Sequence, residues 1–165
     1  MKITDITTTP LKTGKGLLRI QTDAGVEGWA ESPGTNPGVP GKNGAVFEAY
    51  LESIIKPVLV GEDPLQIEHH WQYLYRMGPF RGSALSGAIS AVDIALWDIK
   101  GKFFEAPVWK LLGGKVRDRV RLHLLMGSVI PPSGSDSRSE GLRYGAEVAA
   151  KEGFTAIKTD PLPVG

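Results

Sequence analysis

The stretch GFTAIKTDP, residues 153–161, places a lysine and an aspartate two positions apart at the end of a short apolar run. The run 154–157 predicts a buried β-strand, and side-chain alternation would put Lys158 and Asp160 on one face, about 6–7 Å apart. A carboxylate at that distance favours the protonated lysine. Such a lysine suits a role in holding a substrate carboxylate or donating a proton. The alternative is a structural ion pair.

Other polar side chains offer weaker candidates for chemistry. Arg81 precedes an expected helix whose N-terminus favours anions, so it is either a carboxylate clamp or a surface arginine. His69 and His70 have no acidic or cysteine partner at ligand spacing, which favours structural roles over metal binding. His123 is expected to pack within a strand, and Asp98 to pair with Lys102 four residues on.

Composition excludes several classes of function. The chain has 165 residues, 41% of them hydrophobic, and a net charge of +1 without a basic stripe, which argues against a nucleic-acid partner. There is no cysteine, so disulfides and thiolate chemistry are absent. The sequence has no apolar run of about 20 residues and no signal-peptide pattern, so we expect a cytoplasmic protein without membrane contact.

Hydrophobic periodicity predicts a three-stranded antiparallel meander over residues 2–31, followed by a glycine- and proline-rich loop over 32–44. Four helices are then expected. The first covers 45–57, and the second begins at Pro64 with Asp63 as N-cap and Gln66 completing a capping box. The third covers about 83–103 and is apolar nearly all round, as in the centre of a bundle. The fourth is short and ends at two glycines, 113 and 114.

After residue 118 the pattern changes to strand, helix and strand. Residues 119–126 predict a strand, 140–152 an amphipathic helix with Leu142, Ala146 and Ala149 inside, and 154–158 a second strand. This order is the parallel unit of an α/β fold.

The stretch SGAISAVDIALWDIKGKFFEAPVWKLLGGKVRDRV, residues 86–120, closely resembles the enolase superfamily in its mandelate racemase and muconate-lactonizing branch. Further matching segments are VEGWAE at 26–31, GEDPLQIEHHWQYLY at 61–75 and GFTAIKTDP at 153–161. The resemblance implies an α+β capping domain, here residues 1–117, followed by the start of a (β/α)8 barrel at 118–165. A full barrel takes about 250 residues, so the barrel would be incomplete.

The resemblance also implies the chemistry, which is abstraction of a proton α to a carboxylate through an enediolate with Mg²⁺ as cofactor. The family's metal ligands are acidic residues on later barrel strands, so no metal ligand is expected in this chain. The loops at 10–16 and 32–44 would lie over the site and shape specificity for a small acid substrate. Lys15 and Asn36, with Arg81, are the substrate-binding candidates, and a homo-oligomer is expected.

Racemases of this branch end the second barrel strand in Lys-x-Lys, whereas this sequence has Lys158-Thr159-Asp160. Two close lysines lower each other's pKa, and replacing the second by aspartate removes that effect. This departure favours a carbon-oxygen lyase, an acid-sugar dehydratase, with Lys158 and Asp160 as catalytic candidates. The alternatives are a racemase, epimerase or cycloisomerase of the same superfamily, or a non-catalytic fragment acting as a lid or oligomerisation module.

Overall fold

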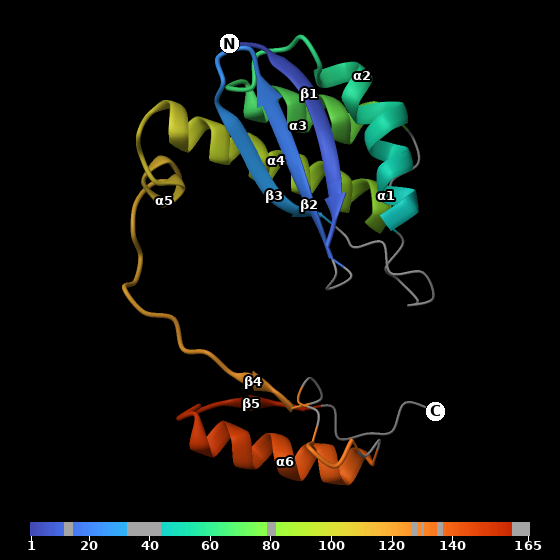
Figure 1. Ribbon diagram of the computed structural model, residues 1–165. Helices are drawn as coiled ribbons and strands as arrows, with labels where there is room; N and C mark the ends of the chain where they lie inside the picture. The colour runs from blue at the N-terminus through green and yellow to red at the C-terminus, as the bar shows by residue number, and fades with distance from the viewer. Residues whose placement is uncertain are drawn as a thin grey trace. The chain divides into compact units, whose positions relative to one another are not determined.

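The computed structural model describes residues 1–11, 15–32, 44–78, 82–126, 129, 131–134 and 137–159. The chain divides into two compact units, Met1–Gly114 and Lys115–Gly165. The first holds a sheet covered by helices, and the second holds two short strands and a helix (Figure 1). Among the described helices, none has the length and apolar character needed to cross a membrane.

The first unit begins with the predicted antiparallel meander, which the structure confirms. Its strands are β1 (Ile3–Pro10), β2 (Gly16–Thr22) and β3 (Glu27–Ser32), in the order β1-β2-β3. The turn between β2 and β3 contains Gly25 at φ +74°, a conformation that glycine adopts without strain. Alternate residues of the sheet face the helices and are buried, among them Ile6, Leu18 and Ala30.

The first helical segment is interrupted by a widened turn that sequence periodicity did not predict. It consists of α1 (Gly44–Tyr50), a π-helical turn η1 (Leu51–Ile55) and α2 (Lys56–Leu59). Pro57 explains the interruption because it has no N–H and its ring clashes with the carbonyl four residues earlier. The wider turn keeps Phe47, Leu51 and Ile55 on one buried face.

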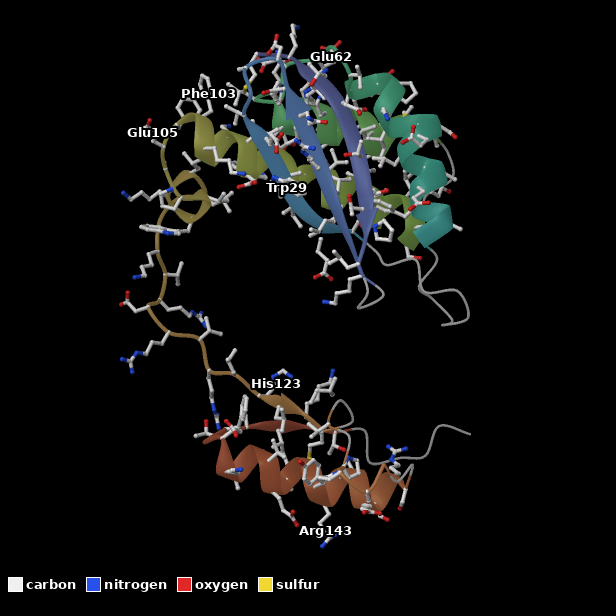
Figure 2. All side chains as sticks on the ribbon, viewed as in Figure 1. Trp29, Glu62, Phe103, Glu105, His123 and Arg143 are labelled. Atoms are coloured by element: carbon white, nitrogen blue, oxygen red, sulfur yellow. The ribbon has the colours of Figure 1, made fainter. Side chains whose placement is uncertain are left out.

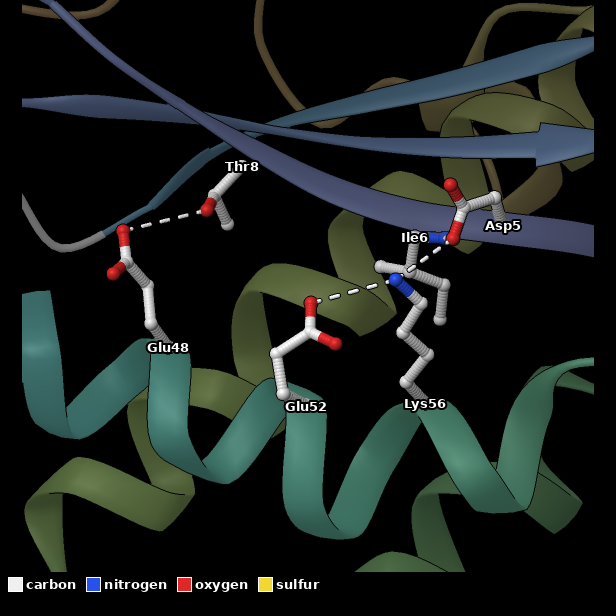
Figure 3. A network of polar contacts seen from close by, with 6 residues as sticks. All are labelled: Asp5, Ile6, Thr8, Glu48, Glu52 and Lys56. Carbon is white, nitrogen blue, oxygen red and sulfur yellow. Dashed lines mark hydrogen bonds and ion pairs between the residues drawn. The ribbon is translucent and has the colours of Figure 1, made fainter.

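An ion-pair network joins this helical segment to β1 (Figure 3). Lys56 Nζ lies 2.9 Å from Asp5 Oδ1 and 3.4 Å from Glu52 Oε1, and the hydroxyl of Thr8 donates to Glu48 Oε1 at 3.5 Å. The hydrogen bond from Lys56 holds the pKa of Asp5 below its ordinary value. These contacts join the helical segment to β1, the edge strand of the sheet.

The second predicted helix begins three residues later than the capping pattern indicated. The helix is α3 (Ile67–Arg76), and Gln66 at its N-cap makes no side-chain capping bond, so the predicted capping box is wrong. Asp63 Oδ1 instead accepts a hydrogen bond from the backbone N–H of Leu65 at 3.0 Å. This local turn satisfies the aspartate outside the helix. The Asp63 carbonyl also bonds His70 Nε2 at 2.8 Å, which makes His70 a buried structural histidine.

The long helix α4 (Ser83–Phe103) matches its predicted range and lies across the sheet (Figure 1). Its buried side includes Leu85, Ile89, Leu96 and Ile99. The expectation of burial nearly all round is wrong, because Ile94 is half exposed. The helix has a sheet on one side and other helices beside it, which leaves one stripe facing outward.

The open edge of β3 is closed by two charged side chains of α4. Asp98 Oδ2 accepts a hydrogen bond from the backbone N–H of Trp29 at 2.9 Å, and Lys102 Nζ donates to the Glu27 carbonyl at 2.7 Å. The predicted pair between Asp98 and Lys102 is present at 2.7 Å. Gly28 permits this approach, because a Cβ atom there would lie 2.1 Å from the backbone oxygen of Ala95.

Asp93 on α4 is expected to make the fold less stable at neutral pH. Burial raises its pKa, and the nearby charge of Glu68 adds to this; the described residues give its carboxylate no hydrogen bond. Since the folded-state pKa lies above the ordinary 3.8, the destabilisation is present above that folded pKa and disappears as the pH falls below 3.8. Asp93→Asn should therefore raise the melting temperature at pH 7, with a gain that shrinks on acidification toward pH 4. An equal gain at both pH values would contradict this account.

The first unit ends in the short helix α5 (Val108–Leu111). It was predicted to stop at two glycines, and Gly113 and Gly114 have φ values of +107° and +104°. The N–H of Gly114 bonds the Trp109 carbonyl at 2.9 Å, which caps the helix as glycines in this conformation do.

The second unit contains the predicted strand–helix–strand unit, with β4 (Leu124–Leu125), α6 (Arg138–Lys151) and β5 (Ile157–Lys158). The strands pair in parallel, as predicted, but each is only two residues long. Parallel strands are normally covered on both faces, and the described residues of this unit provide one helix for these two strands. Ala146 is exposed, contrary to expectation, and Gly145 takes the buried position instead, with Met126 only 3.2 Å from a built Cβ.

Candidate functional site

Lys158 lies at the carboxyl end of β5, beside the carboxyl end of β4. Leu125 is its register partner, and Leu124 pairs with Ile157. The Lys158 side chain is exposed, and no described residue pairs with its ammonium group. Carboxyl ends of parallel strands lie at one edge of a sheet, which is where α/β folds hold their ligands. Lys158 ends a strand, as predicted, but the prediction that this strand is buried is wrong, because Ile157 is 52% exposed.

Asp160, the second candidate of the pair, lies outside the described residues. The predicted separation of about 6–7 Å from Lys158, and the choice between a structural ion pair and a site, stay predictions.

Arg121 links the two segments that precede β4 and β5. Arg121 Nε donates to Thr155 Oγ1 at 2.9 Å, and the guanidinium also bonds the Thr155 carbonyl. These hydrogen bonds join the segments that lead into the two strands. We therefore assign Arg121 a structural role. His123, labelled in Figure 2, comes just before β4 and is exposed, so the expectation that it packs within the strand is wrong.

Lys15 forms an ion pair that the sequence reasoning missed. Its Nζ lies 3.1 Å from Glu31 Oε2, and both side chains are exposed. The antiparallel register that places Leu17 opposite Glu31 is the signal that predicts this proximity. The pair connects the hairpin after β1 with the end of β3, at the base of both loops proposed to shape specificity. An exposed ion pair of this kind contributes little to stability, and the substrate-binding role of Lys15 stays a prediction.

The other two substrate-binding candidates, Asn36 and Arg81, lie outside the described residues. Their roles stay predictions.

The described segments bring no three histidine, aspartate or glutamate side chains together at a spacing suited to a metal ion. Mg²⁺ needs several oxygen ligands in an octahedral arrangement. The side chains that the structure describes therefore do not fit a magnesium site, and no chemical step is assigned to a metal in this part of the protein.

Residues 4–113 match the family model described as mandelate racemase / muconate lactonizing enzyme, N-terminal domain. A relative named D-galactonate dehydratase, from Verminephrobacter eiseniae (strain EF01-2), is 43% identical over 159 residues, which cover 96% of this chain and 38% of that protein. The chain thus spans less than two fifths of the relative's length.

Solved structures of the enolase superfamily also match this chain. A member of the enolase superfamily from Salmonella typhimurium matches with a TM-score of 0.81 and 30% identity, over 96% of this chain and 42% of its own. An enolase from Pantoea ananatis with bound d-gluconate and Mg matches with a TM-score of 0.73 and 28% identity, over 94% of this chain and 35% of its own. The chain therefore belongs to the mandelate racemase / muconate lactonizing enzyme family, of whose N-terminal domain residues 4–113 are an example.

Proposed function

We propose that this chain is the N-terminal part of an acid-sugar dehydratase, with D-galactonate as the first substrate to test. The observation that carries the proposal is the 43% identity to a D-galactonate dehydratase over 96% of the chain. The d-gluconate in the Pantoea ananatis structure supports the same class of substrate, a sugar acid.

The proposed reaction removes the proton α to the carboxylate and expels the β-hydroxyl as water. The enol that results becomes a 2-keto-3-deoxy acid, so the atoms balance without an oxidant or reductant. Lys158 supplies a positive charge at the strand ends, where it either holds the substrate carboxylate or protonates the leaving hydroxyl. Asp160 is proposed to keep Lys158 protonated, or to accept a proton if its pKa is raised.

We further propose that the two units are a capping domain and the first strands of a (β/α)8 barrel. The parallel pairing of β4 and β5 through α6 supports the barrel assignment. Mg²⁺ dependence belongs to the complete enzyme in this proposal, with its carboxylate ligands on strands beyond this chain. Lys15, Asn36 and Arg81 are proposed to contact the substrate from the cap, and the complete enzyme is proposed to be a homo-oligomer.

A racemase or epimerase of the same superfamily is the second candidate. It shares the removal of the α-proton but returns a proton to the opposite face and keeps the hydroxyl. The aspartate at position 160 disfavours it, because a second lysine there would lower the pKa of Lys158 and make it a base.

The experiment uses a chimera in which this chain replaces the matched 159 residues of the D-galactonate dehydratase. The folded chimera, checked by its melting curve, should convert D-galactonate into a keto acid that a carbonyl reagent detects. The unaltered dehydratase is the positive control. A folded chimera without keto-acid product would count against the dehydratase proposal.

A further inference from the structure

The register of β4 against β5 decides which face of the strand pair carries Lys158. Leu125 is the register partner of Lys158, and Leu124 is that of Ile157; within the described residues the ladder consists of these two pairs. Successive side chains of a strand point to opposite faces, so a slip of one residue would carry Lys158 to the other face. A register set by so short a ladder depends on contacts outside it.

The segment between α6 and β5 is anchored at both of its ends. The Phe154 N–H bonds the Ala149 carbonyl at 2.9 Å, which attaches the start of the segment to the end of α6. The Ala156 carbonyl accepts a hydrogen bond from the Leu124 N–H at 3.1 Å, directly before the ladder. Thr155 lies between these two anchors, at a bend in the chain.

Arg121 holds this bend through two atoms of one residue. Its Nε donates to Thr155 Oγ1 at 2.9 Å, and its guanidinium also donates to the Thr155 carbonyl. A planar guanidinium with two acceptors fixes direction as well as distance. Arg121 precedes β4 and Thr155 precedes β5, so sliding one strand past the other by one residue, about 3.3 Å, would break both hydrogen bonds.

We propose that Arg121 and Thr155 are positioning residues that set the strand register and thereby the place of Lys158. The proposal rests on the proposed role of Lys158 in the dehydratase reaction. Lys158 lies three residues beyond Thr155, about 10 Å along an extended chain, so Arg121 acts through the strand and not on the substrate. Reacting groups must be placed closely, and a misplacement of about 1 Å is enough to slow a reaction strongly.

The kinetic test uses the chimera with the D-galactonate dehydratase. Arg121→Ala should lower kcat about tenfold or more at a temperature where its melting curve shows a folded protein. Arg143→Ala is the matched control, because Arg143 is an exposed arginine of α6 whose guanidinium lies 3.9 Å from Glu147. It should leave kcat unchanged. A normal kcat for the folded Arg121→Ala chimera would overturn the proposal.

The same substitution in the Lys158→Ala chimera separates positioning of Lys158 from a general effect on the fold. Arg121→Ala should cause no further loss of the residual activity there, because the group that it positions is already absent. An equal fold loss with and without Lys158 would overturn the proposal, since Arg121 would then act on something else.

Two substitutions of Thr155 provide a milder test, in case the Arg121 variant folds poorly. Thr155→Val keeps the shape of the side chain but removes the hydroxyl acceptor, and should lower kcat about threefold or more. Thr155→Ser keeps the hydroxyl and should retain the activity. Equal kcat values for these two variants would contradict a role for the hydrogen bond from Arg121.

The register can also be measured without any activity. The chain has no cysteine, so Leu124→Cys with Ile157→Cys places two thiols on register partners, where they should form a disulfide that peptide mass spectrometry identifies. Adding Arg121→Ala should slow this reaction about threefold or more, because a slipped strand turns one thiol to the opposite face. An unchanged rate would overturn the proposal. An inactive parent chimera in which Arg121→Ala still slows the reaction would contradict the dehydratase proposal alone.

Discussion

Gly28→Ala is expected to destabilise the first unit by about 3 kcal/mol, at the upper end of the usual cost of overpacking a core. The added Cβ would lie 2.1 Å from the Ala95 carbonyl oxygen and 2.7 Å from Ile99 Cγ1. Because the obstacle is helix backbone, α4 and β3 must separate. Separation also weakens the hydrogen bond that Asp98 accepts from the Trp29 N–H and the one that Lys102 donates to the Glu27 carbonyl.

Gly78→Ala is the matched control, since a Cβ at that position meets nothing within 4 Å. Denaturant unfolding of both variants measures the difference. A Gly28→Ala protein as stable as the Gly78→Ala protein would show that the close approach of α4 and β3 is not a feature of the molecule.

Lys158→Ala in the chimera with D-galactonate dehydratase is expected to lower kcat/KM about 100-fold or more. The variant removes the positive charge at the carboxyl end of β5, and groups that transfer protons or orient a reacting carboxylate contribute effects of this size. If Lys158 holds the substrate carboxylate, KM rises along with the fall in kcat. If it donates a proton, kcat falls with little change in KM.

Lys151→Ala is the control for Lys158→Ala, because Lys151 is also an exposed lysine of the second unit but ends α6, away from the strand ends. It should leave both kinetic constants unchanged. Normal kinetics for Lys158→Ala with a lower melting temperature would instead assign Lys158 to a structural ion pair.

Local sequence signals predicted the type and range of several elements. Side-chain alternation and the turn at Gly25 were enough for the meander, and the apolar composition of residues 83–103 was enough for the range of α4. Family resemblance identified the enolase superfamily, and its mandelate racemase branch, from residues 86–120. The family match over residues 4–113 confirms it.

Features that depend on contacts between distant residues were missed. Asp63 lies in a sequence pattern typical of an N-cap, but its side chain accepts a hydrogen bond from the Leu65 N–H in a separate turn. Hydrophobic periodicity cannot distinguish a helix cap from such a turn. The ion pair of Lys15 with Glu31 requires the strand register. Glu105 adopts a left-handed backbone conformation, and the sequence does not indicate this because the residue is neither glycine nor asparagine. Predicted strands at 119–126 and 154–158 were longer than β4 and β5, because strand length depends on neighbours to pair with.

The most direct test of the proposed activity follows the C2 proton of D-galactonate by NMR in deuterated buffer, with the folded chimera as catalyst. We expect the C2 signal to disappear as signals of a 3-deoxy-2-keto acid appear, with both changes stopped by a chelator and restored by Mg²⁺. Loss of the C2 signal by deuterium exchange, with the hydroxyl at C3 retained, would indicate a racemase or epimerase. That result, or an unchanged spectrum beside an active parent dehydratase, would contradict the proposal that this chain forms part of a sugar-acid dehydratase.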